Sequence, residues 1–135
     1  MLWPYGLLAE RISMKIKINR DYFMPKIKER FGGERRAYHD QSVDFADDVL
    51  EMCQEWMDEE PWNDDLELDT RREMRINLTR HIKKKVDFTD HTKSYFLPTF
   101  VWVYLAQAVI GWIVKQIIEY YWTDIRAELP KNKNS

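Results

Sequence analysis

Residues 98–129 read PTFVWVYLAQAVIGWIVKQIIEYYWTDIRAEL, and this stretch decides the fold. Pro98 suits the first turn of a helix and Pro130 ends one, so we predict a single helix of about 45 Å between them. Apolar side chains cover a wide arc of this helix, which is typical of the central helix of a bundle. A narrow polar stripe recurs at every fourth residue: Gln107, Gly111, Lys115, Glu119 and Thr123.

A short helix is predicted in the first quarter of the chain. Asp21 can cap a helix from Tyr22 to Phe31, and Pro25 is tolerated in its first turn. The glycine pair at 32–33 stops it. Before this helix, the alternation of lysine and isoleucine over residues 15–18 predicts a short strand or an extended arm.

Two further helices carry clear apolar rows. One extends from about Ser42 to Glu59, with the rows Phe45, Val49, Met52, Trp56 and Ala46, Leu50, Cys53, Met57. The spacing of Thr70 and Glu73 is a capping box that opens the next helix, which frays near the lysines at 83–85. Its apolar row is Met74, Leu78 and Ile82.

These segments predict one all-α domain over residues 14–130, a small helical bundle of three to four helices packed on the long C-terminal helix. The chain of 135 residues is long enough for one core. Residues 131–135 form a polar tail. Residues 1–13 are interpreted as a flexible arm or as upstream read-through, with Met14 as an alternative start.

The cysteine and histidine content limits the chemistry of the chain. A single cysteine, Cys53, excludes an internal disulfide and every Cys-based zinc site, and fits a cytoplasmic protein. Its place among apolar residues predicts an inert buried thiol. His39, His81 and His91 lie in or beside charged segments, which predicts surface imidazoles rather than metal ligands.

A membrane anchor is an alternative for part of the long helix. Residues 95–114 carry no charged side chain and are apolar enough to span a bilayer. However, Gln107 would lie near the bilayer centre, and the apolar pattern continues well past Lys115. We therefore favour a buried central helix, with a single-span membrane-anchored protein as the alternative.

Charge is strongly segregated along the sequence. No lysine or arginine lies between Arg36 and Arg71, a stretch that contains thirteen aspartates and glutamates. Asp44, Asp48, Glu51 and Glu55 place like charges one turn apart on the second helix, where they repel each other. The repulsion can be offset by the chain's own basic segments, by a basic protein partner, or by a divalent cation.

The segment Asp44-Phe45-Ala46-Asp47-Asp48-Val49-Leu50 resembles the acidic helix motif of the all-α nucleotide pyrophosphohydrolases of the MazG kind. The resemblance covers these seven residues and implies Mg²⁺ bound by Asp44, Asp47, Asp48 and Glu51. That family also has a Glu-x-x-Glu pair on an earlier helix, whereas residues 22–39 supply only Glu29 and Glu34. A magnesium-dependent nucleotide pyrophosphohydrolase is thus an alternative function.

The function we predict is that of a small non-enzymatic interaction or regulatory protein without a cofactor. It would bind a protein partner or form a homo-oligomer, and its size and lack of catalytic motifs suit a viral or mobile-element accessory protein. The predicted interaction residues are Trp56, Trp62, Tyr120, Tyr121, Trp122, Asp44, Asp48, Glu51 and Glu55. A net charge of −2 argues against nucleic acid as the main ligand, despite the basic run at 80–85.

Overall fold

The computed structural model describes residues 16–32, 39–86, 88 and 98–129, and none of these residues forms a strand. The helices are α2 (Arg20–Phe31), α3 (His39–Glu59), α4 (Arg71–Lys85) and α5 (Thr99–Glu128), and a short 3₁₀ helix, η1 (Pro61–Asn63), follows α3. The predictions for residues 1–13 and 131–135 lie outside the described ranges.

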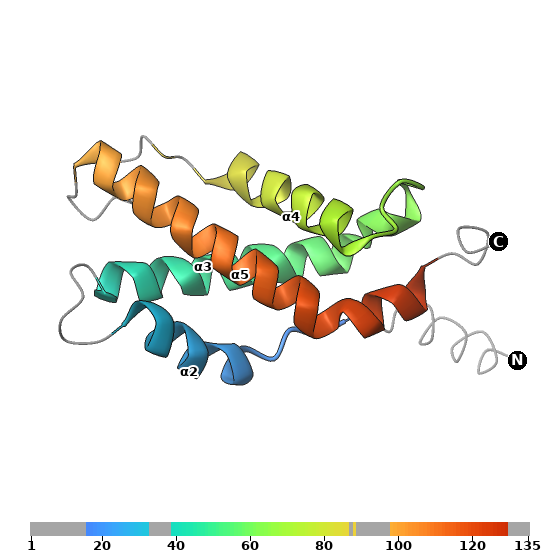
Figure 1. Ribbon diagram of the computed structural model, residues 1–135, viewed down its shortest axis with the longest axis horizontal. Coiled ribbons are helices and arrows are strands. Elements are labelled where there is room, and N and C mark those ends of the chain that lie inside the picture. The colour runs from blue at the N-terminus through green and yellow to red at the C-terminus, as the bar shows by residue number, and fades with distance from the viewer. Residues whose placement is uncertain (1–15, 33–38, 87, 89–97, 130–135) are drawn as a thin grey trace, which may run out of the picture.

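Helix α5 extends along the bundle and lies across α3, with α4 on one side and α2 on the other (Figure 1). It packs against α3 and α4, while α3 also packs against α2 and α4. The predicted fold class is therefore confirmed: this is a small all-α bundle built around a long C-terminal helix.

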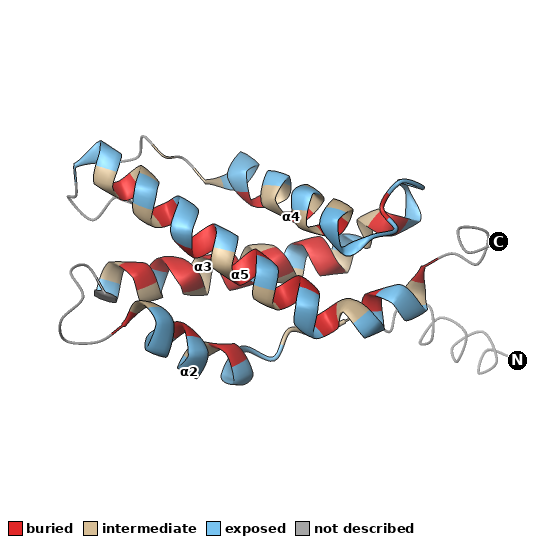
Figure 2. Ribbon diagram, in the orientation of Figure 1, coloured by how far each residue is buried: buried red, intermediate tan, exposed pale blue. Residues whose placement is uncertain are grey.

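The core forms where α5 meets its neighbours (Figure 2). The predicted rows of α3 are buried except for Met52, which is half-buried, and the predicted row of α4 has no exposed surface. Burial of this apolar area is the main stabilising contribution to the fold. The buried face of α5 consists of Trp102, Ala106, Val109, Ile110, Ile113, Val114, Ile117, Ile118, Tyr121 and Ile125.

The ends of the longer helices are close to their predicted positions. Thr70 Oγ1 accepts a hydrogen bond from the Glu73 N–H at 3.1 Å, so the predicted cap of α4 is confirmed. Pro98 is the cap of α5 rather than its first residue. Helix α3 begins at His39, ahead of the predicted start at Ser42.

Helix α2 begins earlier than predicted, because Asn19 and not Asp21 caps it. Asn19 Oδ1 accepts a hydrogen bond from the Tyr22 N–H at 3.2 Å. Asparagine and aspartate are equally good caps, so local preference does not choose between the two positions. Pro25 consequently lies beyond the first turn, where its missing N–H removes the helical bond to the carbonyl of Asp21.

The residues before α2 form an extended arm and not a strand. The side chain of Gln54 on α3 takes the place of a neighbouring strand. Its Oε1 accepts a hydrogen bond from the Ile18 N–H at 2.7 Å, and its Nε2 donates to the Ile16 carbonyl at 3.0 Å. The next N–H, of Asn19, donates to the Tyr121 hydroxyl at 2.7 Å, so the arm is tied to both α3 and α5.

Candidate functional site

One face of α5 stays at the surface along the helix. The predicted polar stripe is exposed at all of its positions, Gln107, Gly111, Lys115, Glu119 and Thr123. Toward the start of the helix the stripe continues with Phe100 and Tyr104, which are each 77% exposed. The free face of α5 is therefore aromatic at its start and polar or charged toward its end.

A shallow groove of about 450 Å³ follows this face between α4 and α5. Gly111 leaves the groove open, since a Cβ atom added there would meet nothing within 4 Å. The groove is lined by Arg75, Ile76, Thr79, Arg80, Lys83, Gly111 and Val114. Because three of these side chains are cationic, the groove suits an anionic ligand or surface.

Helical spacing places two of these cations, Arg75 and Lys83, beside the core. Arg75, Thr79 and Lys83 each follow a residue of the buried row of α4, one position further along the chain. A step of one position turns a side chain by about 100° around a helix, from the core to the flank that α5 borders. The buried row of α4 thus sets the orientation of the cationic flank.

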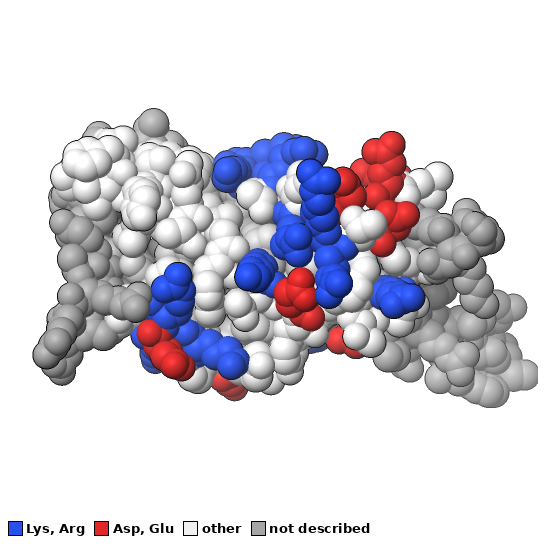
Figure 3. Space-filling view, in the orientation of Figure 1, with Lys and Arg blue, Asp and Glu red and all other residues white. Residues whose placement is uncertain are grey.

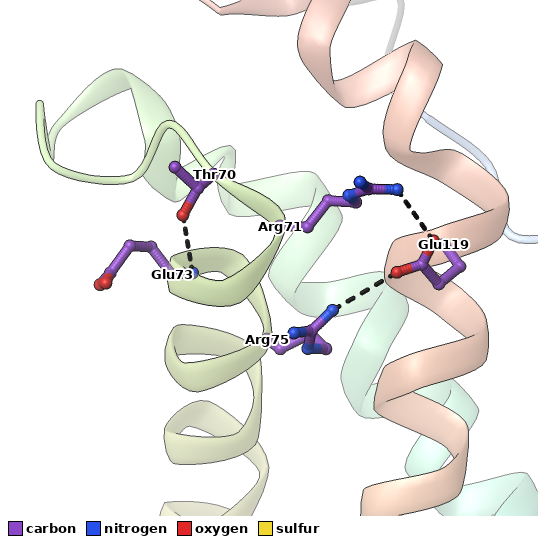
Figure 4. Close-up of polar contacts among 5 residues, drawn as sticks. All are labelled: Thr70, Arg71, Glu73, Arg75 and Glu119. Atoms are coloured by element: carbon purple, nitrogen blue, oxygen red, sulfur yellow. Dashed lines mark hydrogen bonds and ion pairs between the residues drawn. The ribbon is translucent and has the colours of Figure 1, made fainter.

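A carboxylate on α5 connects this helix to the first turns of α4 (Figure 4). Glu119 accepts hydrogen bonds from Arg71 Nη1 at 3.2 Å and from Arg75 Nη1 at 3.4 Å. All three side chains are partly exposed, so each pair contributes at most about 1 kcal/mol. Their main effect is to fix the start of α4 against the second half of α5.

The remaining cations of this region form no ion pair with any residue that the structure describes. Within the described ranges, no ion pair involves Arg80, Lys83, Lys84 or Lys115. Lysine and arginine side chains gather over α4 and the adjacent part of α5, next to an uncharged surface over the start of α5 (Figure 3). We call this surface the α4–α5 face and define it by Ile76, Arg80, Lys83, Lys84, Phe100, Tyr104 and Lys115.

Two of the predicted aromatic anchors lie in the core. Trp56 and Trp62 are 1% and 0% exposed, and their rings pack edge to face with centroids 5.5 Å apart. The Trp56 Nε1–H donates a hydrogen bond to Asn77 Oδ1 at 2.8 Å, which joins α3 to α4. Trp62 lies in η1, which turns its ring into the core.

The three anchors near the end of α5 differ in exposure. Tyr121 is buried, Trp122 is half-buried, and Tyr120 is 48% exposed. The ring of Tyr120 packs against that of Tyr22 on α2, with centroids 4.4 Å apart. Tyr120 is thus the predicted anchor with the most accessible ring.

The acidic helix is partly paired within the chain. Asp47 forms an ion pair with Arg20, and Glu55 forms one with Lys85 at 2.8 Å. These contacts join α3 to α2 and to α4, and they offset part of the repulsion along α3. A second group has no ion pair to any described residue and forms an acidic stripe on α3: Asp44, Asp48 and Glu51.

The predicted magnesium ligands do not gather around one point. Across the described residues, no three histidine, cysteine, aspartate or glutamate side chains lie close enough together to hold a metal ion. Asp44, Asp47, Asp48 and Glu51 all belong to the described residues, so they do not form such a group. The magnesium ion and the hydrolase activity that the resemblance implies stay predictions.

Two groups with reactive side chains are shielded from water. Burial raises the pKa of the Cys53 thiol, which is 0% exposed, as expected for an inert thiol. His81 is not the surface imidazole that was predicted, because its side chain is 14% exposed and lies 3.7 Å from Glu59 on α3. Burial lowers the pKa of His81. His91 and the side chain of His39 lie outside the described part of the chain.

Phe100 and Tyr104 were not among the predicted site residues. The sequence feature that marks them is their helical spacing. Phe100 lies four residues before Tyr104, and Tyr104 lies three residues before Gln107, the first residue of the polar stripe. Among apolar neighbours this spacing does not reveal which side chains stay exposed. The start of α5 extends beyond the end of α4, so α4 does not cover these two rings (Figure 1).

Helix α5 has the length and composition of a membrane span as well as a place in the core. Within Thr99–Glu128, the most apolar window of 18 residues has a mean hydropathy of 1.5, and 44% of that window is buried inside the protein. The core helix of a soluble protein passes the same test. Residues 95–97 of the predicted anchor lie outside the described ranges.

No protein-family model, curated protein or solved structure matches the chain significantly.

Proposed function

We propose that the protein is a small non-enzymatic interaction protein that attaches to an anionic surface through its α4–α5 face. The observation that carries this proposal is the position of cations, which form no ion pair with any described residue, near two aromatic side chains that are each 77% exposed. Large exposed apolar side chains mark interaction surfaces, and aromatic and arginine side chains supply most of their binding energy. Mechanistically, the protein would act by occupying the surface to which it binds.

In this proposal the protein works in the cytoplasm, with α5 as a core helix. The single cysteine, Cys53, leaves the chain without an internal disulfide, which fits a reducing compartment, and the ten buried side chains of α5 support its role in the core. A binding role without catalysis also suits a small accessory protein of a virus or mobile element.

A second copy of the chain is an alternative anionic partner for the same face, because α3 carries the acidic stripe of Asp44, Asp48 and Glu51. This stripe supports the predicted homo-oligomer, since it complements the α4–α5 face in charge. Light scattering during size-exclusion chromatography tests the homo-oligomer. We expect a molar mass above that of the monomer at low salt and the monomer mass at about 0.5 M salt, where screening is strong. A monomer at both salt concentrations would contradict it.

Retention on a heparin column tests the attachment to an anionic surface. Heparin is a highly sulfated polyanion that offers no bilayer interface for aromatic rings. It therefore tests the charge of the α4–α5 face and not the contribution of Phe100 and Tyr104. The double variant Arg80→Glu/Lys83→Glu should elute at a clearly lower salt concentration than the unsubstituted protein. The matched control Lys26→Glu/Lys28→Glu makes the same change in net charge on α2 and should elute close to the unsubstituted protein. Equal elution of the two variants would mean that net charge alone causes retention, and the proposal would fail.

A further inference from the structure

We propose that the anionic surface is that of a lipid bilayer. The protein binds peripherally, with Phe100 and Tyr104 inserted at the membrane interface and the cations of the α4–α5 face over the headgroups. This inference rests on the proposed function and names its partner. It differs from a membrane span, because α5 stays in the core of the bundle.

The aromatic part of the α4–α5 face protrudes from the bundle. Phe100 and Tyr104 lie one turn apart at the start of α5, and both are more exposed than any other large hydrophobic residue that the structure describes. The start of α5 also extends beyond the end of α4 (Figure 1). Protruding aromatic rings can enter the headgroup region without any rearrangement of the fold, and aromatic side chains are enriched at that depth.

The cationic part of the face lies next to an uncharged surface over the start of α5, the segment that carries these rings (Figure 3). Arg80 and Lys83 line the groove, and Lys84 and Lys115 are exposed beside it. The cytoplasmic leaflet is negatively charged, and each lysine or arginine near it strengthens binding roughly fivefold. Four such cations together supply a strong dependence on anionic lipid.

The shape of the face favours a bilayer over a folded partner. The groove is shallow, and the two rings, each 77% exposed, are not among the residues that line it. A fluid surface needs no complementary shape, whereas a protein interface does. The acidic stripe on α3 and the net charge of −2 also disfavour a long polyanion that contacts several sides of the protein.

The remaining apolar surface explains why the attachment is reversible. Most of the apolar face of α5 is already buried against α3 and α4. Apart from Phe100 and Tyr104, the α4–α5 face contributes one large apolar side chain, Ile76, which is 38% exposed. Two or three interfacial side chains anchor a protein only weakly, so binding needs the anionic lipids and is released by salt.

Co-sedimentation of the full chain with vesicles tests the inference. One set of vesicles is pure phosphatidylcholine, and the other contains about 30% phosphatidylserine to give an anionic surface. The protein should bind the anionic vesicles at least tenfold more tightly than the neutral ones and should be released at about 0.5 M salt. Phe100→Ser/Tyr104→Ser should weaken binding to anionic vesicles at least tenfold while far-UV circular dichroism stays unchanged. Arg80→Glu/Lys83→Glu should weaken it more, and Lys26→Glu/Lys28→Glu should have little effect.

Several results would overturn the inference. Equal binding to neutral and anionic vesicles would show that the cations do not contribute. Equal binding of Phe100→Ser/Tyr104→Ser and the unsubstituted protein to anionic vesicles would show that the rings do not contribute. Protein that is released only by detergent would indicate a spanning helix. Retention on heparin without any vesicle binding would refute the membrane surface but leave the proposed function intact. Tighter binding to a single-stranded oligonucleotide than to anionic vesicles would identify nucleic acid as the partner instead.

Discussion

The hydroxyl oxygen of Tyr121 accepts a hydrogen bond from the backbone N–H of Asn19 at 2.7 Å, across 102 positions of the chain. This bond joins the cap of α2 to the second half of α5. Replacement of Tyr121 by Phe keeps the ring and removes the acceptor, which leaves a partly buried N–H without its partner. We expect a loss of about 0.5–1.5 kcal/mol in the free energy of unfolding, measured by urea denaturation.

The neighbouring residue provides a matched control for this change. Tyr120→Phe removes a hydroxyl from a ring that is 48% exposed and keeps its contact with Tyr22. It should change the free energy of unfolding by less than about 0.5 kcal/mol. If the two variants are equally stable, the bond from Asn19 to Tyr121 does not stabilise the protein.

The predicted anchors should separate into core and surface residues when they are replaced. Trp62→Ala removes a ring that is 0% exposed and packs on Trp56, so it should cost about 3–5 kcal/mol and largely unfold the protein. Tyr120→Ala should cost much less, because about half of that side chain is in water. Thermal unfolding followed by circular dichroism measures both. A folded, stable Trp62→Ala variant would show that the Trp56–Trp62 contact is not part of the core.

Gly111 should be replaceable with a gain in stability. It lies in the middle of α5, and a Cβ atom added there would meet nothing within 4 Å. Alanine is favoured over glycine inside a helix by about 0.5–1 kcal/mol, so Gly111→Ala should raise the free energy of unfolding by that amount. Urea denaturation checks the change. A destabilised variant would mean that another segment or a second copy approaches α5 closely at this position.

Local spacing was sufficient to predict the helices and most of the core. The rows that contain Val49 on α3 and Leu78 on α4 follow the helical period, and the Thr70 cap has a characteristic motif. The position of the arm could not be predicted in this way. It depends on hydrogen bonds between Gln54 and backbone groups that lie 36 and 38 positions earlier in the chain, and no local pattern marks such a residue. Contacts of the arm also place Asn19 rather than Asp21 at the helix start.

The candidate site was harder to predict than the fold. Periodicity identifies the polar stripe at Lys115 and Glu119, where charge distinguishes the free face from the core. At the start of α5 every side chain is apolar or small, so periodicity cannot show that Phe100 and Tyr104 are exposed. Their exposure depends on where α4 ends relative to α5, which is a tertiary relationship.

His81 should make the protein less stable at mildly acidic pH. Burial lowers the pKa of His81 from its ordinary value of 6.5, although the nearby Glu59 opposes the shift. The folded state therefore binds this proton less tightly than the unfolded state. The stabilisation is fully present above pH 6.5 and is lost as the pH falls through the lowered pKa. Urea denaturation between neutral and acidic pH should show this decline, and His81→Gln should reduce it. If the free energy of unfolding of His81→Gln falls with pH as steeply as that of the unsubstituted protein, groups other than His81 cause the loss of stability.

Hydrogen exchange of the full chain in detergent-free buffer tests the central claim most directly, namely that α5 is the core helix of a water-soluble bundle. We expect the amides of residues 106–118 to exchange as slowly as the slowest amides of α3, because both are exposed only when the whole bundle unfolds. Rapid exchange across residues 106–118 while α3 and α4 remain protected would contradict this account, as would a protein that is soluble only in detergent. Either result would show that α5 is not part of the core in water.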